Sequence, residues 1–104
     1  LSSSYFTVKT SDTKTLRARL LYQSKKRGIL ENDILIGDFA DEFLGSMSHD
    51  ELVDYDKLIN GEHMEWDLYY YMSGKKQPPQ DVADSKAFHK LREYVVSKAS
   101  QGGK

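Results

Sequence analysis

The chain has 104 residues, of which 38% are hydrophobic and 30% are charged, and this length and composition suit one domain with a modest core. It contains no cysteine, which excludes a disulfide scaffold, a thiolate zinc site and a cysteine nucleophile. The formal net charge is −1, and because no apolar run exceeds a few residues we expect no membrane-spanning segment.

Residues 1–13 are rich in serine and threonine without periodicity, and we expect a flexible N-terminal arm there. The chain begins with leucine, which suggests a processed or trimmed form with no targeting peptide left to read. Residues 14–98 carry helical periodicity and form the expected domain. Residues 99–104 are expected to be a flexible tail.

Two helices are predicted on either side of a basic-to-acidic corner. The first begins near Thr13 or Thr15 and ends at Arg27, and Gly28 stops it because glycine takes a left-handed conformation without steric cost. The second covers residues 30–44. Its first turn carries two acids, which the helix dipole favours, and they are Glu31 and Asp33. The apolar faces are predicted to be Leu16, Leu20, Leu21, Leu35, Phe39 and Phe43.

A third helix is predicted by the sequence SHDE, in which Ser48 is the N-cap and Glu51 the third helical residue of a capping box. Its inner stripe is predicted to be Leu52, Tyr55, Leu58 and Ile59.

A fourth helix is predicted over residues 62–72, with one apolar line formed by Met64, Leu68 and Met72. We interpret Trp66 as a core residue, because aromatic side chains at helical spacing are usually packed; an exposed Trp66 would instead anchor an interface.

After Gly74, the sequence KKQPPQ predicts an extended connection, because two successive prolines exclude a helix. A fifth helix is predicted from Asp84 or Ser85 to about Ser97, with an apolar line formed by Phe88, Leu91 and Val95. No strand-like alternation is present, so the expected fold is all-α: a small five-helix bundle.

The charge is sorted along the chain. Residues 1–30 carry seven cations and one acid, residues 31–67 one cation and twelve acids, and residues 68–104 seven cations and three acids. This segregation suits complementary packed helices, and it equally suits a surface that steers one large partner. Nucleic acid is not expected as a partner, because the acidic middle would repel phosphates.

The sequence offers no clear catalytic, cofactor or metal site. The three histidines, His49, His63 and His89, lie in different predicted helices or helix starts. His63 and Asp67 share one helix face, but a structural zinc ion takes four ligands and no second pair is visible. The glycine-rich motifs that hold nucleotide phosphates and the G-x-S-x-G motif of hydrolases are also absent.

Two blocks of the sequence resemble a known family. RARLLYQSKKRGILENDILIGDFAD and LVDYDKLINGEHMEWDLYYYMSGKKQPP are similar to the succinate dehydrogenase assembly factor 2 family, the flavinylation factors of complex II, over roughly residues 15–80. The arginine-glycine-x-x-glutamate signature of that family falls on Arg27, Gly28 and Glu31, and Asp33 completes its acid pair. The second block matches at Tyr55-Asp56 and Trp66-Asp67.

The resemblance implies a five-helix assembly factor, not an enzyme, that binds the flavoprotein subunit of succinate dehydrogenase. It would promote covalent attachment of FAD to a histidine of that subunit. The tyrosines could stack on a flavin, but no phosphate-binding feature supports FAD as a cofactor of this chain, so direct contact with FAD stays open. The arm and the tail are similar to those of a mitochondrial member with its presequence removed, which implies the mitochondrial matrix.

The resemblance also implies the residues that bind the partner, which are Arg27, Gly28, Glu31, Asp33, Tyr55, Asp56, Trp66 and Asp67. In this reading Gly28 permits close approach, Arg27 offers its planar fork across the interface, and the acids pair with cations of the partner. Two alternatives stay open: a flavin transferase that uses Glu31 or Asp33 as acid or base, and a generic helical adaptor. A monomer is expected, because no heptad seam is present.

Overall fold

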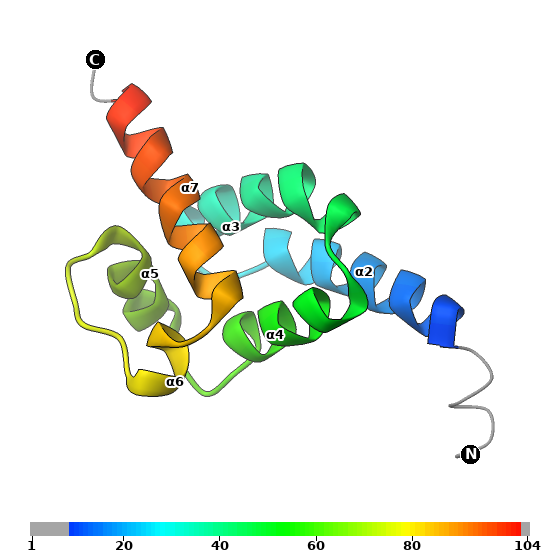
Figure 1. Ribbon diagram of the computed structural model, residues 1–104. Helices are drawn as coiled ribbons and strands as arrows, with labels where there is room; N and C mark the ends of the chain where they lie inside the picture. The colour runs from blue at the N-terminus through cyan, green and yellow to red at the C-terminus, as the bar shows by residue number, and fades with distance from the viewer. Residues whose placement is uncertain (1–8, 103–104) are drawn as a thin grey trace.

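The computed structural model describes residues 9–102, and within them every regular element is helical (Figure 1). The elements are α2 (Lys9–Lys25), α3 (Leu30–Phe43), the 3-10 turn η1 (Leu44–Ser46), α4 (His49–Ile59), α5 (Glu65–Ser73), α6 (Gln80–Ala83) and α7 (Lys86–Gly102). The all-α class is confirmed for this part of the chain. The five-helix description is approximate, because α6 and η1 add two short elements to five longer helices.

α2 and α3 form a helical hairpin, α4 returns beside α2, and α7 crosses α3 and α4 (Figure 1). Gly37 of α3 is buried against α2, where an added Cβ would lie 3.3 Å from Cγ of Lys25. Glycine therefore allows close approach of the two helices at this point. Within residues 9–102, no helix has both the length and the hydropathy needed to cross a bilayer.

The core lies where α2, α3, α4 and α7 meet. Its centre is aromatic: the ring of Phe39 lies 5.7 Å from that of Tyr55 and 5.7 Å from that of Tyr94. The predicted inner stripe of the third helix and the apolar line of the last one are confirmed as buried. Together with two residues predicted on the first two helices, the predicted apolar residues that are buried here are Leu20, Phe39, Leu52, Tyr55, Leu58, Ile59, Phe88, Leu91 and Val95.

Two predicted helix ends are confirmed. Ser48 and Glu51 form the capping box: the Ser48 backbone N–H donates to the Glu51 carboxylate at 2.7 Å, and the Glu51 N–H donates to the Ser48 hydroxyl at 3.2 Å. The first of these bonds lowers the pKa of Glu51. At the end of α5, Gly74 has φ +82°, the left-handed conformation expected of a terminal glycine.

Several boundaries differ from those predicted. α2 begins at Lys9, so residues 9–13 belong to the first helix and not to an arm, while residues 1–8 lie outside the described part of the chain. α2 also ends at Lys25, two residues before Arg27. α7 continues to Gly102, which places the backbone of residues 99–102 in a helix; residues 103–104 are not described.

The fourth helix begins at Glu65 and not at residue 62, because Met64 is extended and forms its N-cap. Met64 is exposed and lies outside the apolar line predicted for it. The short helix α6 was not expected. Pro79 is its N-cap, so the two prolines do exclude a helix at their own positions but permit one immediately after them.

Candidate protein-docking site

Residues 26–29, called the corner here, reverse the chain between α2 and α3. Gly28 has φ +110°, which confirms its predicted left-handed conformation, and an added Cβ would meet nothing within 4 Å. Ile29, the N-cap of α3, makes no side-chain capping bond. The carboxylate of Asp33 instead accepts a 2.6 Å hydrogen bond from the backbone N–H of Arg27. Asp33 therefore holds the corner in shape.

The guanidinium of Arg27 points into the molecule, and its side chain is only 6% exposed. It pairs with Glu65, with Nε 3.2 Å from Oε1 and Nη2 2.7 Å from Oε2. It also donates to the backbone carbonyls of Gln23 and Ile59. The expectation that Arg27 offers its fork to a partner is wrong, because these donors are already used inside the chain.

Glu65 links the corner to the start of α5. Besides pairing with Arg27, it accepts two hydrogen bonds from Nδ2 of Asn32, at 2.9 Å to its backbone oxygen and at 3.0 Å to Oε1. Asn32 is fully buried, and its Oδ1 has no hydrogen-bond partner among the described residues. The amide is thus oriented by its donors alone. Glu65 and Asn32 are site residues that the sequence did not single out, although Glu65 directly precedes Trp66.

The outer side of the corner is exposed and partly apolar. Gly28 and Glu31 face solvent, and Glu31 makes no ion pair within the described part of the chain. Leu30 is 68% exposed, and Ile34, one turn later on the same face of α3, is exposed as well. Sequence reasoning missed these two residues. Their positions could have indicated exposure, because neither lies on the helix face that carries the buried residues Ile36, Phe39 and Ala40.

Trp66 is 45% exposed, so its interpretation as a core residue is wrong and the alternative, an exposed aromatic, is the observed state. Its ring contacts those of Tyr69 and Tyr70, with centroids 5.8 Å and 6.1 Å away. Because Trp66 follows Glu65, the ion pair of Glu65 with Arg27 fixes the start of this aromatic cluster relative to the corner. Asp67 pairs with Lys76 at 2.8 Å, and this bond raises the pKa of Lys76.

Tyr55 is fully buried, so its expected direct contact with a partner is wrong. Its hydroxyl lies 2.5 Å from that of Ser24, which also donates a 2.6 Å hydrogen bond to the carbonyl of Leu20. Since a serine hydroxyl carries one proton, Tyr55 is the donor to Ser24. Burial raises the pKa of Tyr55 to about 12, against a lowering by this hydrogen bond. Tyr55 therefore supports α2 one turn before Arg27.

Asp56 lies farther along the α2–α4 interface. It pairs with Arg19 at 3.0 Å and accepts a 2.8 Å hydrogen bond from the side chain of Asn60. Partial burial alone would raise the pKa of Asp56, but these bonds outweigh it and lower that pKa. Asp56 is thus committed to an intramolecular pair, although part of its side chain reaches solvent.

The histidines are engaged separately. His49 Nδ1 lies 2.7 Å from the hydroxyl of Thr13, the ring of His63 packs edge-on against Tyr71, and His89 Nε2 lies 2.5 Å from the carbonyl oxygen of Ala83. Residues 9–102 contain no group of three histidine or acidic side chains placed to hold a metal ion.

Six of the eight predicted residues fall into two sets, while Asp56 and Asp67 form ion pairs with Arg19 and Lys76. Arg27, Asp33 and Tyr55 form or support a buried framework, whereas Gly28, Glu31 and Trp66 are presented outward on it. Exposed apolar and aromatic side chains on a bonded framework are typical of protein-docking surfaces. The fold and the site are therefore those of a small helical protein with an exposed surface of the kind suited to docking on another protein.

Comparison with known families specifies this class. The family model described as "Flavinator of succinate dehydrogenase" matches residues 18–95, and the chain belongs to this family. The protein named "Succinate dehydrogenase assembly factor 2, mitochondrial" from Caenorhabditis elegans is 66% identical over 79% of this chain and 69% of its own length. The protein of the same name from Schizosaccharomyces japonicus is 42% identical, over 82% of this chain and 58% of its own length. These relatives are named assembly factors and not enzymes.

Proposed function

We propose that this chain binds the flavoprotein subunit of succinate dehydrogenase and promotes covalent attachment of FAD to a histidine of that subunit. Its family membership and the names of its relatives support this proposal. Those names also support a mitochondrial location, and we propose the matrix as the compartment. The observation that carries a docking role is the exposed outer surface of the corner, held by buried bonds.

The corner is suited to docking because its shape is fixed before a partner arrives. Four side-chain contacts, from Asp33 to the backbone and from Arg27 to Glu65, Gln23 and Ile59, restrain it from within. A preformed surface loses little conformational entropy on binding. In the proposed complex, Gly28 lets the partner backbone approach, Leu30 and Ile34 bury apolar area, and Glu31 pairs with a cation of the partner.

The chain need not supply a reacting group. The flavoprotein would supply both reacting groups, with its histidine as the nucleophile and the isoalloxazine ring of its FAD as the electrophile. A docked helper would act by holding the partner in the conformation that aligns these two groups. We propose that it does so as a monomer.

One observation counts against Asp33, though not against Glu31, as the acid or base of the flavin-transferase alternative. The carboxylate of Asp33 is held at 2.6 Å by the backbone N–H of Arg27, so it is occupied as a structural acceptor. A general acid or base must instead reach the proton that it transfers.

Gly28→Arg tests the docking role, with Gly45→Arg as a matched control. Both glycines are exposed and have open space where a Cβ would lie. They differ in backbone conformation, because Gly28 has φ +110° and Gly45 has no positive φ. Both variants add the same side chain, but only the first strains the backbone and obstructs the corner. Co-expression with the flavoprotein subunit should show loss of pull-down and of covalent flavin fluorescence for Gly28→Arg alone.

A third variant separates strain from obstruction. Gly28→Ala keeps the left-handed strain, about 1–2 kcal/mol, but adds only a methyl group. It should reduce binding far less than Gly28→Arg does. If Gly28→Arg captured and flavinylated the partner as well as Gly45→Arg does, the corner would not be the docking surface.

A further inference from the structure

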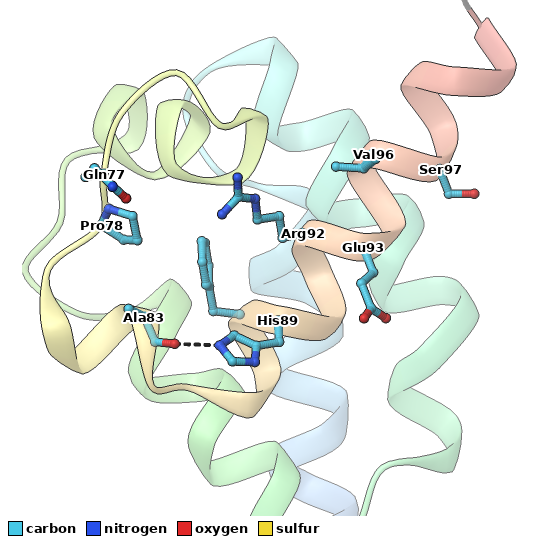
Figure 2. A pocket seen from close by; sticks show the side chains of 9 residues that line it. Gln77, Pro78, Ala83, His89, Arg92, Glu93, Val96 and Ser97 are labelled. Atoms are coloured by element: carbon cyan, nitrogen blue, oxygen red, sulfur yellow. Dashed lines mark hydrogen bonds between the residues drawn. The ribbon is translucent and has the colours of Figure 1, made fainter.

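A second surface feature, here called the α7 groove, lies between α7 and the connection that joins α5 to α6 (Figure 2). It has a volume of about 840 Å³. The buried ring of Phe88 is among its lining residues. Pro78 lies on the side of the connection, and Arg92 and Val96 line the α7 side. Most of the lining residues are exposed, so this is an open groove on the surface and not a closed cavity.

Arg92 is the distinctive side chain of the groove. Figure 2 shows it reaching from α7 toward the connection, and its Nη2 lies 3.3 Å from the position that a Cβ on Gly74 would take. It forms no ion pair or hydrogen bond with any other described residue. Glu93 also lines the groove, but in Figure 2 its carboxylate points away from the Arg92 guanidinium. An unpaired guanidinium of this kind is suited to a carboxylate from outside the chain.

The rest of the groove adds an apolar component and a fixed wall. Val96, one turn after Arg92 on α7, is 55% exposed beside the groove. His89 lies against the end of α6, and because a carbonyl oxygen only accepts, its Nε2 is the donor to Ala83 at 2.5 Å. This bond ties α6 to α7 and so holds one wall in place. Because exposed Val96 lies one turn from the Arg92 guanidinium, a ligand that fits must carry an apolar group close to an anionic one.

We propose that the α7 groove binds an extended segment of a partner protein in which an acidic side chain adjoins an apolar one. Residues 68–104 carry seven cations and three acids, and this net positive charge favours an acidic side chain in the bound segment. The volume is within the range of ligand sites, about 300–1,000 Å³. Gln77 and Ser97, at the edges, supply amide and hydroxyl groups for the backbone of such a segment. This inference goes beyond the proposed function, because it involves neither FAD nor the corner.

The test uses the full chain labelled with nitrogen-15 and the capped peptide Gly-Glu-Leu-Glu-Leu-Gly as the probe. Residue-resolved NMR should show saturable shifts at Gln77, Ala83, Arg92 and Val96. Arg92→Gln should weaken binding about fivefold, the effect of one partly solvated charged hydrogen bond. The matched control Lys98→Gln makes the same change of charge on α7, at a residue outside the groove, and should bind within twofold of the parent.

A peptide in which both glutamates are replaced by glutamine should bind as weakly to the parent chain as the acidic peptide binds to Arg92→Gln. The proposal is overturned if the shifts map elsewhere or if Arg92→Gln binds as the parent does. It is also overturned if sodium acetate alone reproduces the shifts, which would mean a free-anion site. Self-association that Arg92→Gln abolishes would identify a second copy of this chain as the occupant and equally reject the proposal.

Discussion

Within residues 9–102 the backbone turns twice at a left-handed glycine, at Gly28 between α2 and α3 and at Gly74 after α5, and the two turns are built differently. At Gly28, side chains hold the turn from within while its outer side is open, with nothing within 4 Å of an added Cβ. At Gly74, backbone N–H groups close the turn on the carbonyl of Tyr70, and Arg92 covers its outer side.

The difference shows that a left-handed glycine does not by itself mark a docking surface. Both positions meet the same backbone requirement, which glycine satisfies without steric cost. What distinguishes Gly28 is the combination of a buried support and an unobstructed exterior, whereas Gly74 needs no side-chain support and is covered by a cation. The surroundings of each glycine decide what a substitution there would test.

The largest expected effect on the free energy of unfolding comes from replacing the arginine at each turn, Arg27 at the first and Arg92 at the second. Arg27→Met removes the cation that pairs with Glu65 and one donor to each of the carbonyls of Gln23 and Ile59, although Asn32 still donates to Glu65. It should lower the free energy of unfolding by about 3 kcal/mol. Arg92→Met removes no bond and should change it by less than about 0.5 kcal/mol. Urea unfolding of both variants measures the difference, and equal losses would contradict the contrast between the two turns.

A smaller effect, in alkali, concerns the support beneath the first turn. The pKa of Tyr55 is about 12 in the folded chain against 10.0 for an unperturbed tyrosine. Below pH 10 the phenol is protonated in both states and contributes no pH dependence. Between pH 10 and 12 only the unfolded state loses the proton, so stability should fall by about 1.4 kcal/mol per pH unit.

The control for this prediction is Tyr55→Phe, which keeps the ring but has no proton to lose. Its unfolding free energy should lack the Tyr55 component of the alkaline slope, leaving only that of the other tyrosines and the lysines. If the two chains showed parallel slopes above pH 10, Tyr55 would titrate as an exposed phenol and could not be the buried support described here.

Substitutions on the outer side of the corner should have the smallest effect on stability, although they should weaken binding. Replacing both Leu30 and Ile34 with serine should change the free energy of unfolding by no more than about 0.5 kcal/mol, because both side chains are exposed. Capture of the flavoprotein subunit should fall about tenfold. Tyr22→Ser is the control, since Tyr22 is an exposed apolar side chain elsewhere on α2; an equal loss for it would remove the special role of the corner.

Much of the fold was predictable, because helix signals in this chain are local. The capping box at Ser48, the left-handed Gly28 and Gly74, and the buried stripes of α4 and α7 follow from residue type and spacing. α6 was not predictable in the same way, since four residues are too few to show a helical period.

The site was predicted less well, because sequence spacing says which residues share a face but not which face a neighbour covers. Arg27 lies two residues beyond the end of α2, so the helical spacing of α2 does not give the direction of its side chain. Nor does that spacing give its pairing with Glu65, 38 residues away. Trp66 was misplaced because aromatic side chains at helical spacing are usually packed, whereas no neighbouring element of the described chain covers this one. Met64 was misplaced because the predicted helix began three residues early.

The close contact at Gly37 has a consequence for the order in which the molecule assembles. α2 and α3 are joined by four residues and meet without a side chain from α3 at this point, so their contacts close a short loop at little entropic cost. The hairpin can therefore form while a nascent chain is still being made. Glu65 comes from a later segment, so we expect its ion pair with Arg27 to form after the bend and then to stabilise it.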